Sequence, residues 1–279
     1  MQLIKSINKV KKYINRQKKL GKTIGFVPTM GYLHDGHLSL VRAAKKENDL
    51  CVMSIYVNPL QFGPREDFKK YPRNLKADIK LAISAHVDLI FCPTDKEMYE
   101  QDFTTLIEVG ALGNLLCGLS RPGHFKGVAT VVGKFFNIIQ PDVAYFGQKD
   151  AQQAAVIRKF TRDLNYPVKI KVMPIVRESD GLAMSSRNTY LSLEERSDAV
   201  IIYKALQKAK KLIELGNHNP TIIKRFIVDT IKEKGKIDYV EIVNQDTLER
   251  VKKIKGKILI AVAVSIGKVR LIDNLVIKA

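Results

Sequence analysis

Residues 24–40 read Ile24-Gly-Phe-Val-Pro-Thr-Met-Gly-Tyr-Leu-His-Asp-Gly-His-Leu-Ser-Leu40, and this stretch indicates the fold class. A short apolar run typical of a buried strand passes into a loop with two glycines, and residues at helical spacing follow. In a doubly wound sheet, ligands bind at the carboxyl ends of the strands, where the start of a helix offers free N–H groups to an anion. The stretch therefore predicts an anion site with His34 and His37 at its mouth.

The same alternation of short apolar runs and longer periodic segments continues along the chain, which is typical of parallel strands joined by helical crossovers. Besides 24–27, we expect strands at 50–57, 87–91, 143–146 and 168–172, and helices at 38–47, 75–85, 128–139 and 151–164. Residues 1–176 are thus predicted to form an α/β domain with a Rossmann-like doubly wound parallel sheet. Before it, apolar residues at helical spacing favour a surface helix over a basic transit peptide: Leu3, Ile4, Ile7, Val10 and Ile14.

The order of elements changes after residue 176. Helices are expected at 193–215 and 220–234, the second with Asn219 as its N-cap and Pro220 in its first turn. Strands are expected to follow at 237–243, 258–264 and 269–272. Residues 177–279 are therefore predicted to form a smaller C-terminal α+β domain.

The composition limits the partners of this chain. It has 47 Lys+Arg and 28 Asp+Glu, a net charge of +19, with 46% hydrophobic residues, as a globular protein has. The charge is spread over the chain, with 27 basic and 15 acidic residues in 1–176 and 20 and 13 in 177–279. A nucleic-acid-binding arm would concentrate its charge, so we expect no nucleic-acid partner.

Hydropathy and cysteine spacing limit the location. The longest apolar run, 258–266, is far shorter than the about 20 residues of a membrane span, so we expect no membrane association. Cys51, Cys92 and Cys117 fit neither a disulfide framework nor a CxxC metal site. They are expected to be buried thiols in a reducing, cytoplasmic protein.

Three further polar clusters could carry chemistry. Asn58 and Gln61 follow the second strand of the sheet and suit hydroxyl and carboxylate groups, although a plain polar turn remains an alternative. Lys149 is a point charge for phosphate, and Asp150 and Gln153 lie in the first turns of the next helix, where Asp150 could be only an N-cap. The fourth cluster, Met184-Ser-Ser-Arg187, suits a triphosphate, with an ordinary turn as its alternative.

Several site types do not fit the sequence. His34 and His37 have the spacing of a zinc pair, but no third ligand lies nearby, so we expect no protein-held metal. The chain has no G-x-S-x-G nucleophile elbow, no G-x-x-x-x-G-K-[ST] loop, and no G-x-G-x-x-G after the first strand. A bound nucleotide would therefore use a site of the HxGH kind.

Five segments together resemble the pantothenate synthetase (pantoate beta-alanine ligase) family: 27–40, 56–63, 121–132, 146–153 and 176–188. The resemblance implies a nucleotidylyltransferase-like Rossmann domain of the HxGH type, with the C-terminal domain as a lid, in a cytoplasmic homodimer. It also implies a two-step ligase reaction in pantothenate biosynthesis. The carboxylate of (R)-pantoate attacks the α-phosphorus of MgATP to give pantoyl adenylate and pyrophosphate, and the amine of beta-alanine then releases AMP.

The resemblance also implies roles for individual residues. Gln61 and Gln153 would bind pantoate, and Gln61 would also help to bind beta-alanine. His34, His37 and Lys149 would be catalytic, with His37 as proton donor. Asn58, on the residue-based interpretation, is expected beside Gln61 as a substrate-binding residue. Negative charge develops on the departing pyrophosphate, where imidazole and ammonium groups are effective. The ATP site would consist of Met30, Gly31, Tyr32, Leu33, His34, Asp35, Gly36, His37, Gly147, Gln148, Lys149, Asp150, Val176, Met184, Ser185, Ser186 and Arg187.

Two alternatives remain at this point. Another HxGH nucleotidylyltransferase or a class I aminoacyl-tRNA synthetase-like enzyme would share these motifs, although the chain leaves no room for a tRNA-binding domain. A basic nucleic-acid-binding protein would belong to a different class, and salt-sensitive retention on DNA would identify it.

Overall fold

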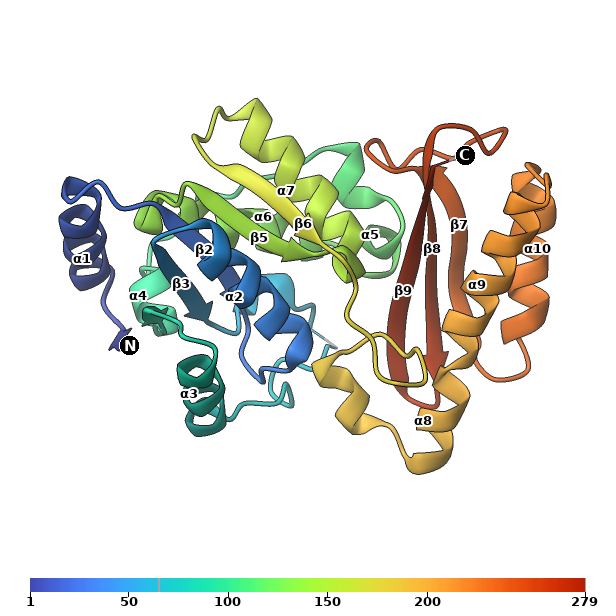
Figure 1. The fold of residues 1–279 in the computed structure, drawn as a ribbon, viewed down its shortest axis with the longest axis horizontal. Helices are drawn as coiled ribbons and strands as arrows, with labels where there is room; N and C mark the ends of the chain where they lie inside the picture. The colour runs from blue at the N-terminus through green and yellow to red at the C-terminus, as the bar shows by residue number, and fades with distance from the viewer. Residues whose placement is uncertain (65, 279) are drawn as a thin grey trace.

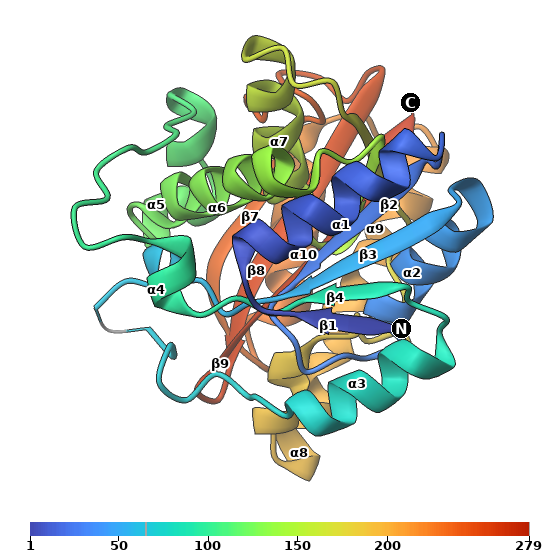
Figure 2. The ribbon, with the colours of Figure 1, turned by 90° about the vertical axis from the view of Figure 1, so that its left-hand side faces the viewer.

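The computed structural model describes residues 1–64 and 66–278, and its main layer is a six-stranded parallel sheet in the order β1-β4-β3-β2-β5-β6. Figure 1 shows β3, β2, β5 and β6 of this sheet, and Figure 2 shows β4 and β1 next to β3. The chain order reverses between β2 and β5, so the carboxyl ends of these two central strands flank the switch point where such sheets bind ligands. The strands are β1 (Gln2–Ile4), β2 (Ile24–Thr29), β3 (Leu50–Ile55), β4 (Leu89–Phe91), β5 (Val143–Gly147) and β6 (Lys169–Met173).

Helices cover both faces of this sheet because alternate strand residues point to opposite sides (Figure 2). Phe26 and Val52 pack in the core beneath α1, α6 and α7, whereas Val27 and Met53 pack in the core beneath α2 and α3. Burial on both faces explains why the strands are apolar runs without alternation. The elements are α1 (Ile7–Lys19), α2 (Asp35–Glu47), α3 (Leu75–Ser84), α4 (Asp95–Met98), α5 (Cys117–Ser120), α6 (His124–Ile139) and α7 (Ala151–Asp163), with short helices η1 (Pro59–Gln61), η2 (Ala111–Asn114) and η3 (Gln148–Asp150).

The C-terminal part is a three-stranded antiparallel sheet, β7-β8-β9, beside the first layer. Along β8, Ile258 and Ile260 pack against α9 and α10, while Leu259 and Ala261 share a core with Leu116 of the first layer. The sheet therefore lies between its own helices and the parallel-sheet layer. Its elements are η4 (Ser186–Tyr190), α8 (Leu193–Ala199), α9 (Ile201–Glu214), α10 (Pro220–Ile231), β7 (Lys236–Asn244), β8 (Lys257–Ile266) and β9 (Val269–Lys278).

The predicted fold class, a doubly wound α/β layer with a smaller C-terminal α+β part, is confirmed. The N-cap prediction is also confirmed, since the Asn219 side chain accepts from two N–H groups of α10. The prediction for the N-terminus was partly wrong: Leu3 and Ile4 belong to β1, which pairs with β4, and the helix begins at Ile7. A three-residue strand is too short for periodicity to separate it from helix.

The expected helix 193–215 is divided at Val200 into α8 and α9, although Val200 keeps helical angles.

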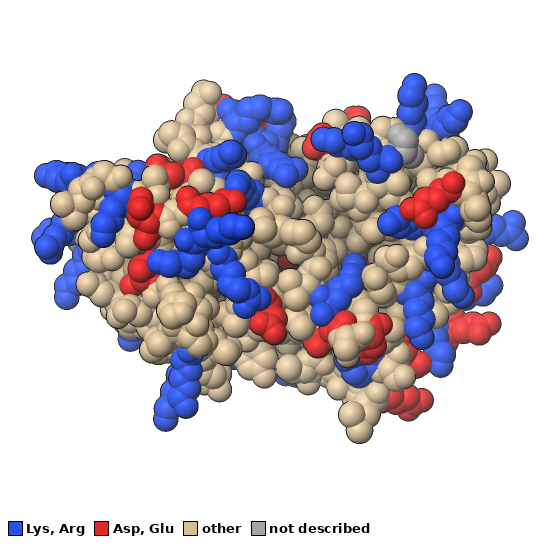
Figure 3. All heavy atoms as spheres, viewed as in Figure 1, with Lys and Arg blue, Asp and Glu red and all other residues tan. Residues whose placement is uncertain are grey.

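Within the described residues, no helix is long and apolar enough to span a membrane. Basic side chains lie on both parts of the face in Figure 3, interspersed with acidic ones, and the centre of that face between the two sheets is hollowed.

Candidate active site

A cavity of about 220 Å³ opens at the carboxyl ends of β2 and β5. All four predicted clusters contribute to its wall, which brings together segments up to 157 residues apart, from Met30 to Arg187. A smaller hollow of about 90 Å³ shares part of this wall and extends toward β9. Predicted site residues on the wall of the larger cavity are Met30, His34, Gly36, His37, Asn58, Gln61, Gly147, Lys149, Asp150, Gln153, Val176, Met184, Ser185, Ser186 and Arg187.

Hydrogen bonds at the start of α2 hold both histidine rings. His34 Nδ1 accepts from the N–H of Gly36 at 3.1 Å, and His37 Nδ1 accepts from the N–H of His34 at 3.4 Å. A ring nitrogen that accepts cannot carry the proton of a neutral imidazole, so in both rings the proton lies on Nε2. Each ring can thus donate from Nε2 to an anion in the cavity.

Both imidazoles are neutral at physiological pH. Burial lowers the pKa of His34 to about 4, and the charge of Lys149 acts in the same direction. Burial, together with His34 and Lys149, also lowers the pKa of His37 well below its usual value. An arriving anion would raise both pKa values, so the rings can stabilise developing negative charge without being cations beforehand.

The loop before α2 owes its shape to Asp78, a buried residue of α3. The two carboxylate oxygens of Asp78 accept from the N–H groups of Tyr32 and Leu33 at 3.0 and 2.8 Å. Gly31 has a φ of +82°, and a Cβ there would lie 2.9 Å from Asp78 Oδ2, so glycine is required. Gly31, Tyr32, Leu33 and the surface residue Asp35 are not on the cavity wall. Sequence reasoning missed Asp78 because no local pattern links a helical carboxylate to a loop 45 residues away.

Gln61 is held in place by Asn58. Asn58 is only 1% exposed, and its Nδ2 donates to Gln61 Oε1 and to the carbonyl of Gly127, each at 3.1 Å. Its Oδ1 accepts from the Tyr99 hydroxyl at 2.7 Å and from the Leu60 N–H at 3.3 Å. Asn58 therefore supports Gln61. Among the described residues, Gln61 Nε2 has only the weak acceptor Sδ of Met30 as a partner, so the amide faces the cavity with a donor to spare.

Lys149 of η3 and Gln153 in the first turn of α7 lie on the cavity wall. Lys149 Nζ is 3.9 Å from Asp150 Oδ1, and the side chain of Asp150 makes no capping hydrogen bond to α7. The structure therefore contradicts the alternative that Asp150 is only a side-chain N-cap. Gln153 is half-buried, and within the described chain its amide has no hydrogen-bond partner.

The neighbours of these residues have structural contacts instead. Gln148 Nε2 donates to Asn274 Oδ1 at 3.0 Å, and Asn274 Nδ2 donates to the carbonyls of Gln148 and Lys149 at 2.9 Å. Gln152 is buried, and its Oε1 accepts from the N–H of Cys117 at 3.0 Å. Adjacent glutamines thus differ in role because helical geometry turns Gln152 to the protein interior and Gln153 to the cavity.

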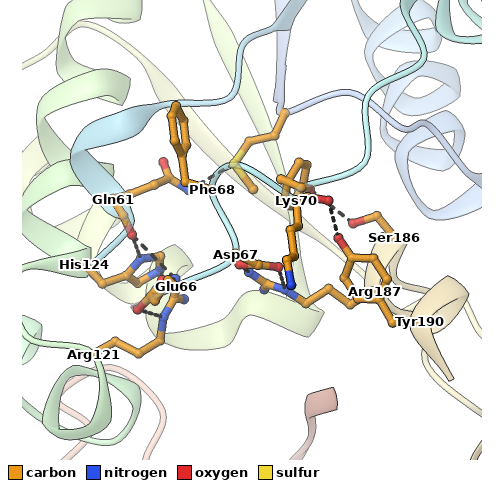
Figure 4. A network of polar contacts seen from close by, with 12 residues as sticks. Gln61, Glu66, Asp67, Phe68, Lys70, Arg121, His124, Ser186, Arg187 and Tyr190 are labelled. Carbon is orange, nitrogen blue, oxygen red and sulfur yellow. Dashed lines mark hydrogen bonds and ion pairs between the residues drawn. The ribbon is translucent and has the colours of Figure 1, made fainter. Parts of the chain in front are cut away.

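Arg187 lies in the cavity wall as part of an ion pair. Its Nε and Nη2 donate to the two oxygens of Asp67 at 3.0 and 2.9 Å (Figure 4). Ser185 Oγ accepts from the N–H of Arg187, and the Ser186 hydroxyl lies 3.1 Å from that of Tyr71. The junction 185–190 is thereby joined to the loop after η1.

Arg121 and His124 also line the cavity, next to Gln61, and sequence reasoning assigned them no role. Their signal was present: a basic residue and a histidine flank Pro122-Gly123 at the start of a helix, in a segment that the family resemblance covered. Within residues 1–64 and 66–278, no group of three His, Cys, Asp or Glu could hold a metal ion.

Comparisons with known proteins agree over the whole chain. Residues 2–276 match the family model described as pantoate-beta-alanine ligase. Curated relatives include the pantothenate synthetases of Caldicellulosiruptor saccharolyticus, 57% identical, and Acetivibrio thermocellus, 55% identical, each over 280 residues and 100% of both chains.

Two solved structures share the fold. That of pantothenate synthetase from Thermus thermophilus has a TM-score of 0.94 at 43% identity and covers 99% of each chain. That of pantoate-beta-alanine ligase from Francisella tularensis, complexed with "Beta-gamma ATP" and beta-alanine, has a TM-score of 0.82 at 37% identity, covering 99% of this chain and 97% of the other.

Proposed function

The chain belongs to the pantoate-beta-alanine ligase family and catalyses the ATP-dependent condensation of pantoate with beta-alanine to pantothenate, and we propose that the cavity at the switch point is its active site. One observation carries this assignment of the site. Two neutral Nε2–H donors, His34 and His37, line the same cavity as Lys149 and the amide of Gln153, which has no hydrogen-bond partner in residues 1–64 and 66–278.

The first step is the attack of the pantoate carboxylate on the α-phosphorus of ATP, with pyrophosphate as the leaving group. His34, His37 and Lys149 would stabilise the charge that develops on the phosphates, and the N-terminus of α2 adds its dipole. Each such donor contributes on the order of 2–4 kcal/mol to lowering the barrier. The triphosphate would also be bound by the junction segment, through Ser185, Ser186 and Arg187. Arg187 can do so because it has N–H groups beyond the two that donate to Asp67.

The second step is the attack of the beta-alanine amine on the acyl carbon of pantoyl adenylate, with AMP leaving. The amides of Gln61 and Gln153 would bind the hydroxyls and acyl oxygen of pantoate. Their placement on one wall supports a single orientation of the substrate through both steps.

Mg²⁺ enters this scheme as part of the MgATP substrate. Phosphate oxygens are the hard ligands that Mg²⁺ prefers, and it commonly keeps several waters and only one or two carboxylates. Asp150 lies on the cavity wall and is a carboxylate that could hold the ion carried by ATP.

We further propose that residues 1–176 are the ATP- and pantoate-binding domain and that residues 177–279 act as its lid. Contacts across the boundary support a lid that reaches the cavity, since Asn274 Nδ2 of β9 donates to the carbonyls of Gln148 and Lys149, and Arg187 pairs with Asp67 at 2.9 Å. A lid would exclude water from the labile adenylate. A homodimer in the cytoplasm completes the proposal, and analytical ultracentrifugation would test the dimer.

Pyrophosphate exchange tests the reaction and the site together. The purified protein should exchange labelled pyrophosphate into ATP only when pantoate is present, and it should form AMP and pantothenate in equal amounts once beta-alanine is added. Exchange without pantoate, or no exchange with it, would contradict the adenylate scheme. If a variant without the Lys149 side chain kept full exchange, the phosphates of ATP would not bind at Lys149.

A further inference from the structure

A chain of hydrogen bonds reaches Gln61 from outside the reacting groups (Figure 4). Arg121 Nε and Nη2 donate to the two carboxylate oxygens of Glu66 at 2.9 and 2.5 Å. Arg121 Nη1 lies 3.0 Å from His124 Nε2, and His124 Nδ1 lies 2.7 Å from the backbone oxygen of Gln61. The reaction scheme above uses neither Arg121 nor His124.

The partners of His124 determine its tautomer. A guanidinium can only donate, so His124 Nε2 is the acceptor. A carbonyl oxygen can only accept, so His124 Nδ1 carries the proton and donates to Gln61. The chain therefore runs in one direction, and each bond in it polarises the next.

The charge states suit this direction. Burial lowers the pKa of His124 to about 4, and the charge of Arg121 adds to the effect, so the ring is neutral at physiological pH. Burial alone would raise the pKa of Glu66, but the hydrogen bond and charge of Arg121 hold it below its usual value. The pair is largely shielded from water, with 16% of the Arg121 side chain and 23% of the Glu66 side chain exposed.

The helix that carries Gln61 needs external support. η1 has three residues, and the N–H of Gln61 lies 3.4 Å from the carbonyl of Asn58, a long contact for a hydrogen bond. The bond from His124 is much shorter and comes from the first turn of α6, a 16-residue helix buried in the core. α6 is thus a rigid reference for the position of Gln61.

We propose that Arg121 and His124 are positioning residues for pantoate, which fix the backbone oxygen of Gln61 and thereby aim its side-chain amide at the substrate. The inference rests on the proposed role of Gln61 in pantoate binding. It predicts that the Nδ1 side of His124 matters for pantoate more than the Nε2 side, because only the Nδ1–H contacts Gln61.

Two substitutions separate the two sides of the ring. His124→Asn keeps an N–H donor near the position of Nδ1, whereas His124→Gln keeps only a polar group near Nε2. His124→Gln should raise the KM for pantoate by about three- to tenfold, as the loss of one hydrogen bond does, with a small change in kcat and none in the KM for ATP. His124→Asn should raise it less. His86→Asn, at an exposed turn far from the cavity, is the matched control and should change neither constant.

Each outcome of steady-state kinetics and pyrophosphate exchange decides between the hypotheses. Equal effects of the two His124 variants, or a shift confined to the KM for ATP, would overturn the positioning role. Absence of pantoate-dependent exchange in the unmodified protein would instead overturn the proposed function. If His124→Gln does not fold, Glu66→Gln tests the same chain of hydrogen bonds, because it weakens the ion pair of this loop residue with Arg121. An unchanged KM for pantoate in Glu66→Gln would overturn the inference.

Discussion

Gly127 determines how closely α6 approaches η1. A Cβ added at Gly127 would lie 2.2 Å from the backbone oxygen of Leu60 and 2.6 Å from the backbone nitrogen of Gln61. Real Cβ atoms in proteins essentially never approach non-bonded heavy atoms closer than 3.0 Å. In Gly127→Ala, η1 must therefore move away from α6 by close to 1 Å, because a backbone atom cannot rotate aside as a side chain does.

This displacement has two measurable consequences. Overpacking of this kind costs about 1–3 kcal/mol of unfolding free energy, and each kcal/mol lowers the Tm of a chain of this size by roughly 2–4 °C. A misplacement of about 1 Å in a substrate-binding group can lower the rate about 100-fold. We expect the variant to fold with a lower Tm and to lose most of its kcat/KM for pantoate, while the KM for ATP stays near that of the unmodified protein.

The assay is pyrophosphate exchange at saturating ATP and varied pantoate, with thermal unfolding followed by circular dichroism. Gly113→Ala is the matched control, since its Cβ would meet Phe125 Cβ at an ordinary 3.7 Å. If Gly127→Ala kept its kcat/KM for pantoate within twofold, the position of η1 would not govern pantoate binding and the assignment of Gln61 would be refuted.

Three further predictions concern the side chains of the cavity. His37→Ala should slow pantoate-dependent exchange by about 100- to 1000-fold, and His37→Gln, which keeps a neutral donor near Nε2, should recover part of it; equal losses would exclude the neutral-donor role. Gln153→Ala should raise the KM for pantoate, and a rise only in the KM for ATP would place Gln153 at the nucleotide. The pKa of His34 and that of His124 are about 4 in the folded chain and about 6.5 unfolded, so the unfolded chain binds more protons between these pH values. The free energy of unfolding should therefore fall as pH drops from 6.5 toward 4 and be insensitive to these groups above 6.5. Urea unfolding at pH 7 and pH 5 measures this fall, which should be smaller in His124→Asn than in the unmodified protein.

Local sequence patterns were enough to predict most, but not all, of the elements of the fold. Apolar runs bounded by polar loops marked β2, β3 and β5, and the pair Asn219-Pro220 marked the start of α10, because these signals act between residues a few positions apart. β1 was missed because its stability comes from pairing with β4, 87 residues along the chain, and not from its own three residues.

The residues of the candidate site likewise include some that the sequence could place and some that it could not. His34 and His37 could be placed from the sequence, since strand, glycine loop and helix are contiguous and the bonds that orient both rings join residues two or three positions apart. Three other contacts could not be predicted from the sequence: that of Asp78 with the loop before α2, that of Arg187 with Asp67, and that of Arg121 with Gln61. These partners are separated by 45 to 120 residues, and a hydrogen bond forms only when packing of whole helices and strands brings donor and acceptor within about 3 Å. Residue order therefore specified which chemical groups the protein has and which local turns they occupy, whereas the packed core set which of them touch the substrates and which support the others.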